Sequence, residues 1–455
     1  MCTLFLVVPI LFAAQDDPVR RARELVEKLR SDKIEERDEA AKSLKQLGSP
    51  AERELEKAST DSPDAEVRSR ASEILEAIRR ARTIKVVSSL PRTGSAGPQT
   101  DSIVKGIRLA FEEAGWKVGD SRIEYEDRDS AQAAGGWRAE LEAVNAARAV
   151  GDPQVMVYIG TYNSGAAKVS MPVLNRAGIV MISPANTYPG LTKPGMGDDG
   201  EPACFRPSGK VNYCRVVPAD DIQGDVGADW AKKLGLKKVY VLDDRETYGK
   251  GIAERFMARA GKIGLTVLGH EGIDPEAKAF APLMDRIKAE APDLIYFGGT
   301  TQTRGGQIAR DIVAAKLTAK LMVPDGCFEE AFIESAGPAS LNDWCYLTFG
   351  GLLPEKLTGK GKAFVRDYVK KHGKMPEAYA VYGYESAKVA LEGIRRAGRL
   401  DRNAIRAACL SIKDFEGTLG KWSFDANGDT TLTAMSGYLV KNGKFEFVET
   451  LQKGE

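Results

Sequence analysis

The segment Gly160-Thr-Tyr-Asn-Ser-Gly165 has the glycine spacing of a phosphate-binding loop. An apolar run, 155–159, precedes it and a helix-compatible segment follows, which is the strand–loop–helix context that such a loop needs. A P-loop places lysine directly after the second glycine, whereas two alanines here come before Lys168. Free backbone N–H groups at a helix start favour an anion, and Ser164 adds a hydroxyl donor. The loop therefore predicts a site for a carboxylate rather than for a triphosphate.

A second polar loop, Ser183-Pro-Ala-Asn-Thr-Tyr-Pro-Gly190, follows the next apolar run. Thr187 can donate a hydrogen bond. The carbonyl of Ala185 is free to accept one, because Pro184 and Pro189 block regular structure around it. The loop ends a buried strand, as the first loop does, and it also lacks a well-placed lysine.

The opposite charge comes later in the chain. Asp325 stands at the end of the run KLMVP (320–324) and could counter an ammonium group. Taken alone, this residue is more often a turn or helix-capping aspartate. Tyr248, within DDRETYGKG, falls at another strand-to-helix junction, where a tyrosine either walls a cleft or lies on the surface.

Nothing in the sequence indicates an enzyme or a metal centre. The chain has no HExxH and no G-x-S-x-G motif, and its only two histidines, His270 and His372, stand in no catalytic motif. Asp425-Ala-Asn-Gly-Asp429 predicts a turn rather than a calcium loop, because its glycine comes two positions early and the distal glutamate is missing. We therefore expect no catalysis, no cofactor and no metal.

The cysteines leave two interpretations open. Cys204 and Cys214 flank a turn-like segment and could form a disulfide, and Cys327 and Cys345 are a second possible pair. Buried free thiols explain both pairs equally well.

Length, charge and the N-terminus restrict the class of protein. The 455 residues suffice for two or three globular units. The 65 basic and 64 acidic residues give a net charge of +1, which predicts neither a nucleic acid nor an anionic membrane as partner. Residues 1–16 contain an apolar run of signal-peptide length, which indicates export.

Residues 17–82 differ from the rest of the chain. They are rich in Glu, Arg, Lys and Ala, and their apolar residues recur with helical spacing. Arg37, Ala40 and Leu44 repeat as Arg68, Ala71 and Leu75, at an offset of 31. The pattern resembles HEAT-type repeats, with only about two helix pairs. Such a segment is either a protein-docking module or a structural element, that is, a spacer or a cap packed on its neighbour, and we favour the structural element.

From Thr83 onward, short apolar runs alternate with helix-length segments. The expected strands form two sets, 83–90, 122–127, 155–160 and 179–185, then 239–244, 266–273, 293–299 and 320–324. Runs of this kind predict parallel sheets covered by helices on both faces. Two successive sets indicate two doubly wound lobes, whose facing strand ends form the expected binding cleft.

Six separated blocks carry a resemblance to a known family. They are IGTYNSGAAKVSMPVLNRAGIVMISPANTYPGLT, RVVPADDIQG, VLDDRETYGKGIAERF, LIYFGGTTQTRGGQIARDI, VPDGCFEEAFIESAG and EAYAVYGYESAKVAL. From about residue 83 to 450 the chain resembles the periplasmic solute-binding proteins of branched-chain amino-acid-type ABC transporters. The resemblance implies two lobes joined by three hinge-crossing strands: 83–218 with 347–433, and 219–346 with 434–455.

The resemblance also implies a role for each loop residue. Ser164 and Thr187 match the groups that hold a ligand's α-carboxylate, and Ala185 and Asp325 match those that hold its ammonium. The remaining matched pocket positions are Tyr248, Tyr379, Thr300, Tyr162 and Asn163. The implied protein is an exported, monomeric receptor that gives an amino acid or a related solute to the membrane subunits of an ABC transporter. The alternative is a sensory module that signals through the N-terminal helices to a protein partner.

Overall fold

The computed structural model describes residues 17–132, 136–452 and 454 and separates the chain into two compact units. The first unit ends at Thr83 and also includes Gly119–Arg122. The second comprises Ile84–Val118 and the chain from Ile123 onward. Within these described ranges no helix is both long and apolar enough to cross a membrane. The expected signal peptide, residues 1–16, lies outside the described residues.

The first unit consists of two helical hairpins. Its helices are α1 (Pro18–Lys28), α2 (Ile34–Leu47), α3 (Ser49–Asp61) and α4 (Ala65–Ala81). The offset of 31 is visible in the contacts, because Arg37 donates to the Ser31 carbonyl at 2.8 Å and Arg68 donates to the Ser62 carbonyl at 2.6 Å. The predicted internal repeat is therefore present, whereas nothing supports the more specific name of a HEAT-type repeat.

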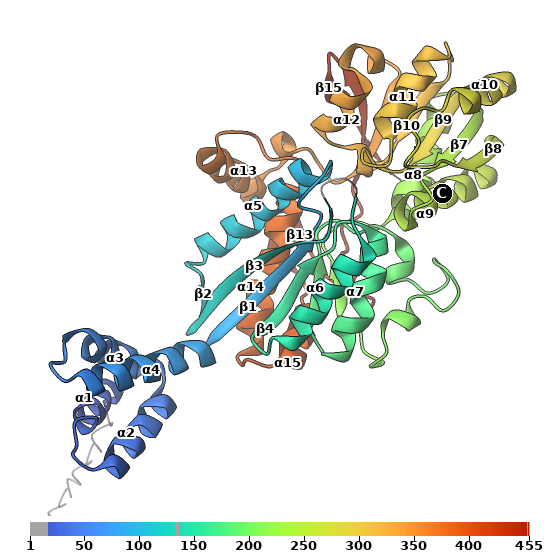
Figure 1. Ribbon diagram of the computed structural model, residues 1–455. Coiled ribbons are helices and arrows are strands. Elements are labelled where there is room, and N and C mark those ends of the chain that lie inside the picture. Colours follow the sequence, from blue (N-terminus) through green and yellow to red (C-terminus); the bar gives the residue numbers. More distant parts are fainter. Residues whose placement is uncertain (1–16, 133–135, 453, 455) are drawn as a thin grey trace, which may run out of the picture. The chain divides into compact units, whose positions relative to one another are not determined.

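The second unit contains two large sheets (Figure 1). The six-stranded sheet has, in spatial order, β2 (Lys117–Val118), β3 (Ser121–Asp129), β1 (Thr83–Leu90), β4 (Val155–Gly160), β5 (Val180–Ser183) and β6 (Tyr213–Arg215). The pairings of β1 with β4, β4 with β5, and β5 with β6 are parallel. Three of the first four predicted strands match β1, β4 and β5, and the predicted strand 122–127 lies within β3.

The seven-stranded sheet is mixed. Its spatial order is β15 (Lys444–Leu451), β14 (Met435–Lys441), β11 (Cys345–Gly350), β10 (Lys320–Val323), β9 (Leu294–Gly298), β7 (Lys238–Asp243) and β8 (Thr266–Gly272). Strands β7 to β11 pair in parallel, as expected. The fold class is as predicted, and the sheet is mixed because, at its other edge, β14 is antiparallel to β11 and β15 is antiparallel to β14. A small pair, β12 (Phe415–Gly417) and β13 (Gly420–Trp422), completes the strands.

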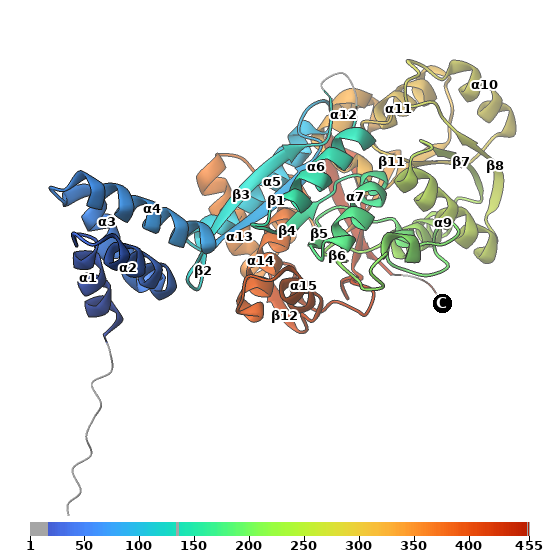
Figure 2. The same cartoon turned by 60° about the horizontal axis from the view of Figure 1, so that its bottom comes forward.

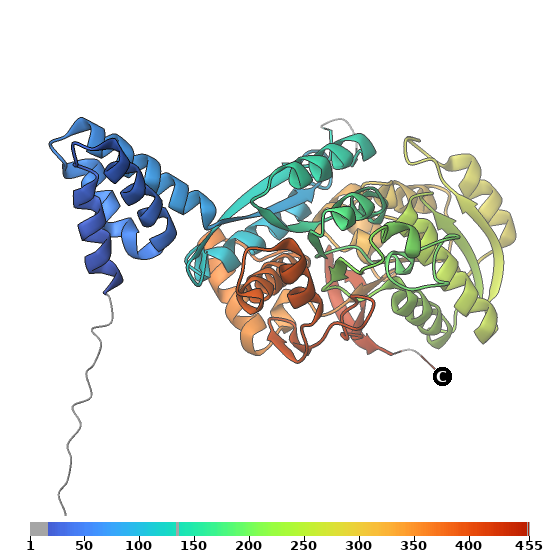
Figure 3. The same cartoon turned by 90° about the horizontal axis from the view of Figure 1, so that it is seen from below.

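Helices cover both faces of each sheet, and the strand sequences alternate between two cores accordingly. In the first lobe, Val86 and Ile159 pack with α5 and α14, whereas Val87 and Tyr158 pack with α6 and α7. The late helices α13 to α15, orange to red, lie with this first lobe (Figures 1 and 3). The helices of the first lobe are α5 (Gly97–Glu113), α6 (Ala139–Gly151), α7 (Ser164–Arg176), α13 (Gly359–His372), α14 (Ala380–Ala397) and α15 (Arg402–Leu410).

The second lobe follows the same rule. Val241 and Tyr296 pack with α8 and α9, whereas Leu242 and Phe297 belong to the core on the other face, with α10 to α12. These helices appear green to orange at one side of the second unit (Figure 2). They are α8 (Asp220–Lys233), α9 (Thr247–Ile263), α10 (Ala281–Glu290), α11 (Gly305–Ala314) and α12 (Glu330–Ala336).

The chain passes between the lobes three times: after β6, after β11 and before β14. The second crossing follows Gly350, because β11 belongs wholly to the seven-stranded sheet. The expected lobe boundary at 346/347 therefore falls within a strand. The other two boundaries, at 218/219 and 433/434, fall in connecting segments.

The structure forms neither of the two disulfides that the sequence left open. Cys204, Cys214, Cys327 and Cys345 all have free thiols. Cys204 is exposed, whereas Cys214 is fully buried in the core beneath β6, so their environments differ. Cys327 and Cys345 are both buried, and burial raises the thiol pKa of each above its usual range.

Candidate functional site

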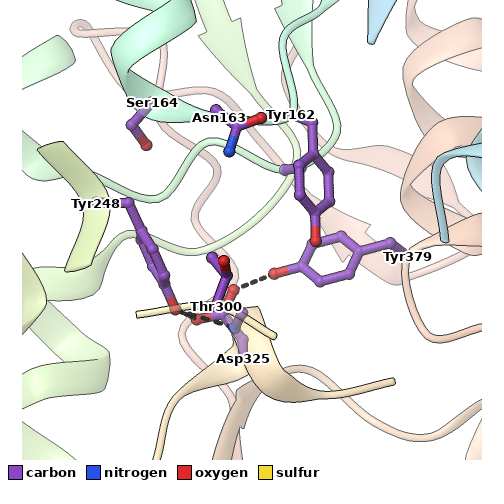
Figure 4. A pocket seen from close by; sticks show the side chains of 9 residues that line it. Tyr162, Asn163, Ser164, Tyr248, Thr300, Asp325 and Tyr379 are labelled. Atoms are coloured by element: carbon purple, nitrogen blue, oxygen red, sulfur yellow. Dashed lines mark hydrogen bonds between the residues drawn. The ribbon is translucent and has the colours of Figure 1, made fainter. Parts of the chain in front are cut away.

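Eight of the nine residues predicted to meet a ligand line one cavity between the lobes (Figure 4). The cavity encloses about 300 Å³ of space free of protein atoms, part of it open to solvent. Gly326 completes its wall, and the ninth predicted residue, Thr187, lies outside the lining. The eight are Tyr162, Asn163, Ser164, Ala185, Tyr248, Thr300, Asp325 and Tyr379.

The first loop presents the start of α7 to this cavity. Ser164 is the first residue of the helix and Asn163 is its N-cap, so the unpaired N–H groups of the first turn lie beside the serine hydroxyl. Lys168 points elsewhere, pairing with Glu201 at 2.6 Å and Asp198 at 3.0 Å. The lysine that a P-loop would require thus anchors a neighbouring loop, and the donors that remain at the start of α7 are neutral.

The second loop is held by a buried ion pair that the sequence did not reveal. Arg215, with no exposed side chain, donates to Asp429 Oδ1 at 2.7 Å and to the Tyr188 carbonyl at 2.8 Å. Asn186 donates to the Tyr162 carbonyl at 2.9 Å and thereby joins the two loops. The turn predicted over 425–429 is present, and its second aspartate fixes the loop that carries Ala185.

Asp325 lies across the cavity at the tip of β10, in the short helix η3 (Asp325–Cys327). Its Oδ1 accepts a hydrogen bond from the Tyr248 hydroxyl at 2.7 Å, and its Oδ2 accepts one from the Tyr379 hydroxyl. Tyr248 comes from the same lobe, whereas Tyr379 comes from the other (Figure 4). Burial raises the pKa of Asp325, and the two hydroxyl donors oppose that rise.

A second carboxylate, Asp220, stands beside this site and was missed in the sequence. It is the first residue of α8, fully buried, and neither of its oxygens accepts a hydrogen bond from the described residues. Burial, reinforced by the charge of Asp325, raises the pKa of Asp220 well above its usual range. The only sequence signal was an acidic helix start, which ordinarily serves the helix dipole.

Thr187 lies next to Asp220 rather than in the cavity wall. Its carbonyl accepts a hydrogen bond from the Asp220 backbone N–H at 2.9 Å. Its buried hydroxyl has no hydrogen-bond partner among the described residues, although it is near enough to lower the pKa of Asp220. The structure therefore places Thr187 beside Asp220 and outside the cavity wall, whereas the resemblance implied that Thr187 contacts the ligand's carboxylate.

The lobes touch beyond the cavity as well. Gln99, on α5, donates to the Phe328 carbonyl of the other lobe at 3.3 Å, and the Tyr162 hydroxyl donates to Gln99. A wider cavity adjoins the first and shares Asn163, Ser164, Tyr248 and Thr300 with it. The site is thus a closed cleft that continues toward the surface along one side.

The chemistry of this cavity fits a small dipolar molecule. One end offers Ser164 and helix N–H groups, the other offers Asp325 and nearby Asp220, and none of the described residues that line the wall is basic. A ligand with only negative charge would face two uncompensated carboxylates. Within the part of the chain that the structure describes, no group of acidic, histidine or cysteine side chains is placed to hold a metal ion.

Comparison with known proteins agrees with this geometry. Residues 83–444 match the family model described as periplasmic binding protein. An amino acid binding protein from Pseudomonas aeruginosa is 30% identical over 348 residues, covering 74% of this chain and 86% of that protein. The Leu/Ile/Val-binding protein BraC3 from Rhizobium johnstonii is 28% identical over 367 residues, covering 79% and 92%.

Solved structures show the same fold. A leucine binding protein, LivK, from Thermotoga maritima superposes with a TM-score of 0.71 at 26% identity, covering 81% of this chain and 99% of that one. A solute binding protein from Rhodopseudomonas palustris, in complex with p-hydroxybenzoic acid, gives a TM-score of 0.69 at 20% identity, covering 82% and 98%. With a matching family model over 83–444 and a two-lobed fold around a dipolar cleft, this chain belongs to the periplasmic binding protein family, a family of extracytoplasmic, non-enzymatic solute-binding proteins.

Proposed function

We propose that this protein binds an amino acid, of branched-chain type or a related small zwitterion, and delivers it to the membrane subunits of an ABC transporter. The observation that carries the proposal is the opposition of charge-binding groups across one closed cavity. Ser164 and the start of α7 face the cavity from one lobe, and Asp325 faces it from the other. The names of the amino-acid-binding relatives support the same ligand class.

In this proposal the ligand lies with its carboxylate at Ser164 and its ammonium between Asp325 and the Ala185 carbonyl. Asp220 strengthens the negative field at the ammonium end. The three tyrosines, Tyr162, Tyr248 and Tyr379, together with Thr300 and Asn163, surround the rest of the molecule. Because the two ends are held by different lobes, the ligand favours the closed state through contacts that the open state lacks.

An aromatic acid is the competing ligand class, since one protein of similar fold holds p-hydroxybenzoic acid. Such an acid brings a carboxylate and no ammonium. It would leave Asp325 and Asp220 buried without a cation, which costs several kcal/mol for an uncompensated buried charge. The amino acid is therefore the better match to this cavity.

Thermal unfolding with matched ligands tests the proposal. Leucine would be compared with 4-methylpentanoate, which lacks the ammonium, with leucinamide, which lacks the carboxylate, and with p-hydroxybenzoate. A ligand that binds only the folded state raises the unfolding temperature by mass action. We expect a rise with leucine or another amino acid of the panel, and little or none with the truncated compounds. Equal stabilisation by 4-methylpentanoate would contradict the assignment of Asp325.

Delivery to a transporter has its own test. Cells that lack this protein should lose high-affinity uptake of the labelled ligand and regain it on complementation. Intact uptake in its absence, together with a binding partner lost on deletion of 17–82, would instead support the sensory module. Export by the segment 1–16 would be checked by N-terminal sequencing of the mature protein.

A further inference from the structure

A second, larger groove lies where the two lobes and one hinge crossing meet, and it shares no lining residue with the ligand cavity. One wall comes from the start of α12 and from the turn between β14 and β15, in the second lobe. The other wall comes from 374–378, just before α14, in the first lobe. The short helix η5 (Pro354–Lys356), in the hinge crossing, closes one side.

Carboxylates dominate this groove, which we call the acidic groove. The charged residues that line it are Glu329, Glu330, Glu334, Glu355, Glu377, Lys374 and Lys444. Five acids therefore face two lysines, and no ion pair involving any of the seven occurs within the described residues. Between the charges stand apolar side chains, including Phe328, Ile333, Phe445 and Met375, the last of which is 41% exposed.

Glu329 and Glu377 show that the charge is uncompensated. Burial raises the pKa of Glu377 to about 7, and Glu330 adds to the rise by repulsion while Lys374 opposes it. Burial raises the pKa of Glu329 to about 7 as well, and Glu377 adds to it. No described cation fully offsets the burial of these two carboxyl groups, so a cation that entered the groove would favour the ionised form of both.

Glu329 also has a vacant acceptor. Only 3% of this residue is exposed, and its Oε1 accepts a hydrogen bond from Gln302 at 2.8 Å. Its Oε2 accepts none from the described residues, and the hydroxyl of Thr301, which lowers its pKa, is likewise unpaired. A buried carboxylate oxygen without a donor is costly, and a cationic donor entering the groove would remove that cost.

We propose that the acidic groove is a docking site for a partner protein, and that the partner inserts an arginine or lysine flanked by apolar side chains. Charge complementarity is the argument for a basic residue, because the groove contains five glutamates and none of them forms an ion pair with a described residue. An arginine side chain can donate two parallel hydrogen bonds to carboxylate oxygens. The apolar walls and the groove volume of about 630 Å³ suit a protein segment rather than an ion. No described group in the groove is placed to hold a metal ion.

Because both lobes line the acidic groove, an occupant contacts the protein across its hinge. Closure around a solute and docking in this groove are then linked, and each must change the affinity of the other by the same factor. The inference concerns a partner surface and does not depend on which solute the cleft holds.

A model peptide tests the docking site on the full chain. The probe is a blocked peptide with one arginine between two leucines, and its control has citrulline, which is uncharged, in place of arginine. Methyl NMR of methionine-labelled protein reports binding at Met375, one of ten methionines, assigned with Met375→Leu. We expect a saturable shift of the Met375 methyl with the arginine peptide and a much smaller one with the citrulline peptide.

Variants then locate the charge. E330Q combined with E377Q should weaken binding of the arginine peptide at least tenfold. The control E290Q, which changes an exposed glutamate on α10 outside the groove, should leave that affinity unchanged. An unmoved Met375 methyl, equal shifts with both peptides, or full binding by the double variant would each refute the proposal. Ethylguanidinium that shifts Met375 as tightly as the peptide would show a small-cation site and overturn docking. If the double variant does not fold, the comparison of the arginine and citrulline peptides on the wild-type protein still tests the proposal.

Discussion

The hydroxyl of Tyr379 donates to Asp325 across the cleft, so the acid at the tip of β10 is bound by a residue of the opposite lobe. Tyr248, from the same lobe as Asp325, donates to the other carboxylate oxygen at 2.7 Å. In the closed protein both oxygens of Asp325 are therefore already oriented toward the cavity by neutral donors. This carboxylate keeps one lone pair or more on each oxygen for a ligand, while the two tyrosines fix its position.

Asp325→Asn should abolish most of the affinity for an amino acid. The amide keeps the size of the side chain and can still meet the two tyrosines, but it removes the charge that opposes the ammonium. Loss of one partner of a buried charge pair costs about 2–5 kcal/mol of binding free energy. Calorimetric titration would measure it. The exposed Asp285, on α10, supplies the control Asp285→Asn, and equal affinity in the two variants would disprove the ammonium site.

Asp220→Asn should change stability and affinity in opposite directions. Both oxygens of Asp220 are buried and accept no hydrogen bond from the residues that the structure describes, so the neutral amide should raise the unfolding temperature of the ligand-free protein near pH 8. The same change should weaken binding of the amino acid about tenfold, because the ligand's ammonium no longer lies near the negative charge of Asp220. Differential scanning calorimetry and titration would be run on the same preparation. A variant that loses stability and keeps affinity would mean a purely structural aspartate.

The parts of the site that the sequence predicted share one property. Ser164, Ala185 and Asp325 each stand within a few residues of the end of a buried apolar run, and the tips of parallel strands meet at one edge of a sheet. Their grouping could therefore be expected from strand order alone. Their roles could not, since Asp325 has the composition of an ordinary turn and only the family resemblance distinguished it.

The features that the sequence did not reveal depend on pairings distant along the chain. Arg215 forms an ion pair with Asp429 at a separation of 214 residues, and no local sequence pattern predicts such a pair. Asp220 looks like any acid at a helix start until the fold buries it opposite Asp325. The antiparallel β15 is largely exposed, so it lacks the apolar run by which the parallel strands were recognised.

Glu142 should make the stability of the protein depend on pH. This glutamate, buried in α6, accepts hydrogen bonds from Ser89 at 2.6 Å and Tyr158 at 2.8 Å, and burial raises its pKa to about 7. An unfolded glutamate has a pKa of about 4.3. The folded state therefore binds the proton more tightly, and the free energy of unfolding must fall as pH rises through this window.

The contribution of Glu142 is fully present below about pH 4.3 and is lost above about pH 7, a change of roughly 4 kcal/mol. Glu142→Gln is neutral at every pH, so urea unfolding between pH 5 and 8 should show a flatter dependence for this variant than for the parent. Glu140→Gln, an exposed change on the same helix, is the control. Parallel curves for Glu142→Gln and the parent would contradict the raised pKa.

Gly251→Ala should hold the lobes apart without unfolding them. Gly251 lies on α9 in the second lobe, and a Cβ at this position would stand 2.6 Å from Cδ2 of Tyr188, in the first lobe. Such a contact forces a shift that costs about 1–3 kcal/mol in a packed interface. The open state does not have this steric contact, because α9 and Tyr188 are separated when the lobes open. The variant should thus keep its unfolding temperature without ligand and bind the ligand roughly 5- to 150-fold more weakly.

Gly261 supplies the matched control, since it lies on the same helix and a Cβ there would meet no atom within 4 Å. Gly261→Ala should leave affinity unchanged and stabilise the helix slightly, as alanine does in place of glycine. Small-angle X-ray scattering with saturating ligand would then separate closure from local damage. If Gly251→Ala closes as fully as Gly261→Ala and binds as tightly, the meeting of α9 with Tyr188 does not limit closure, and the affinity must be set within the cavity itself.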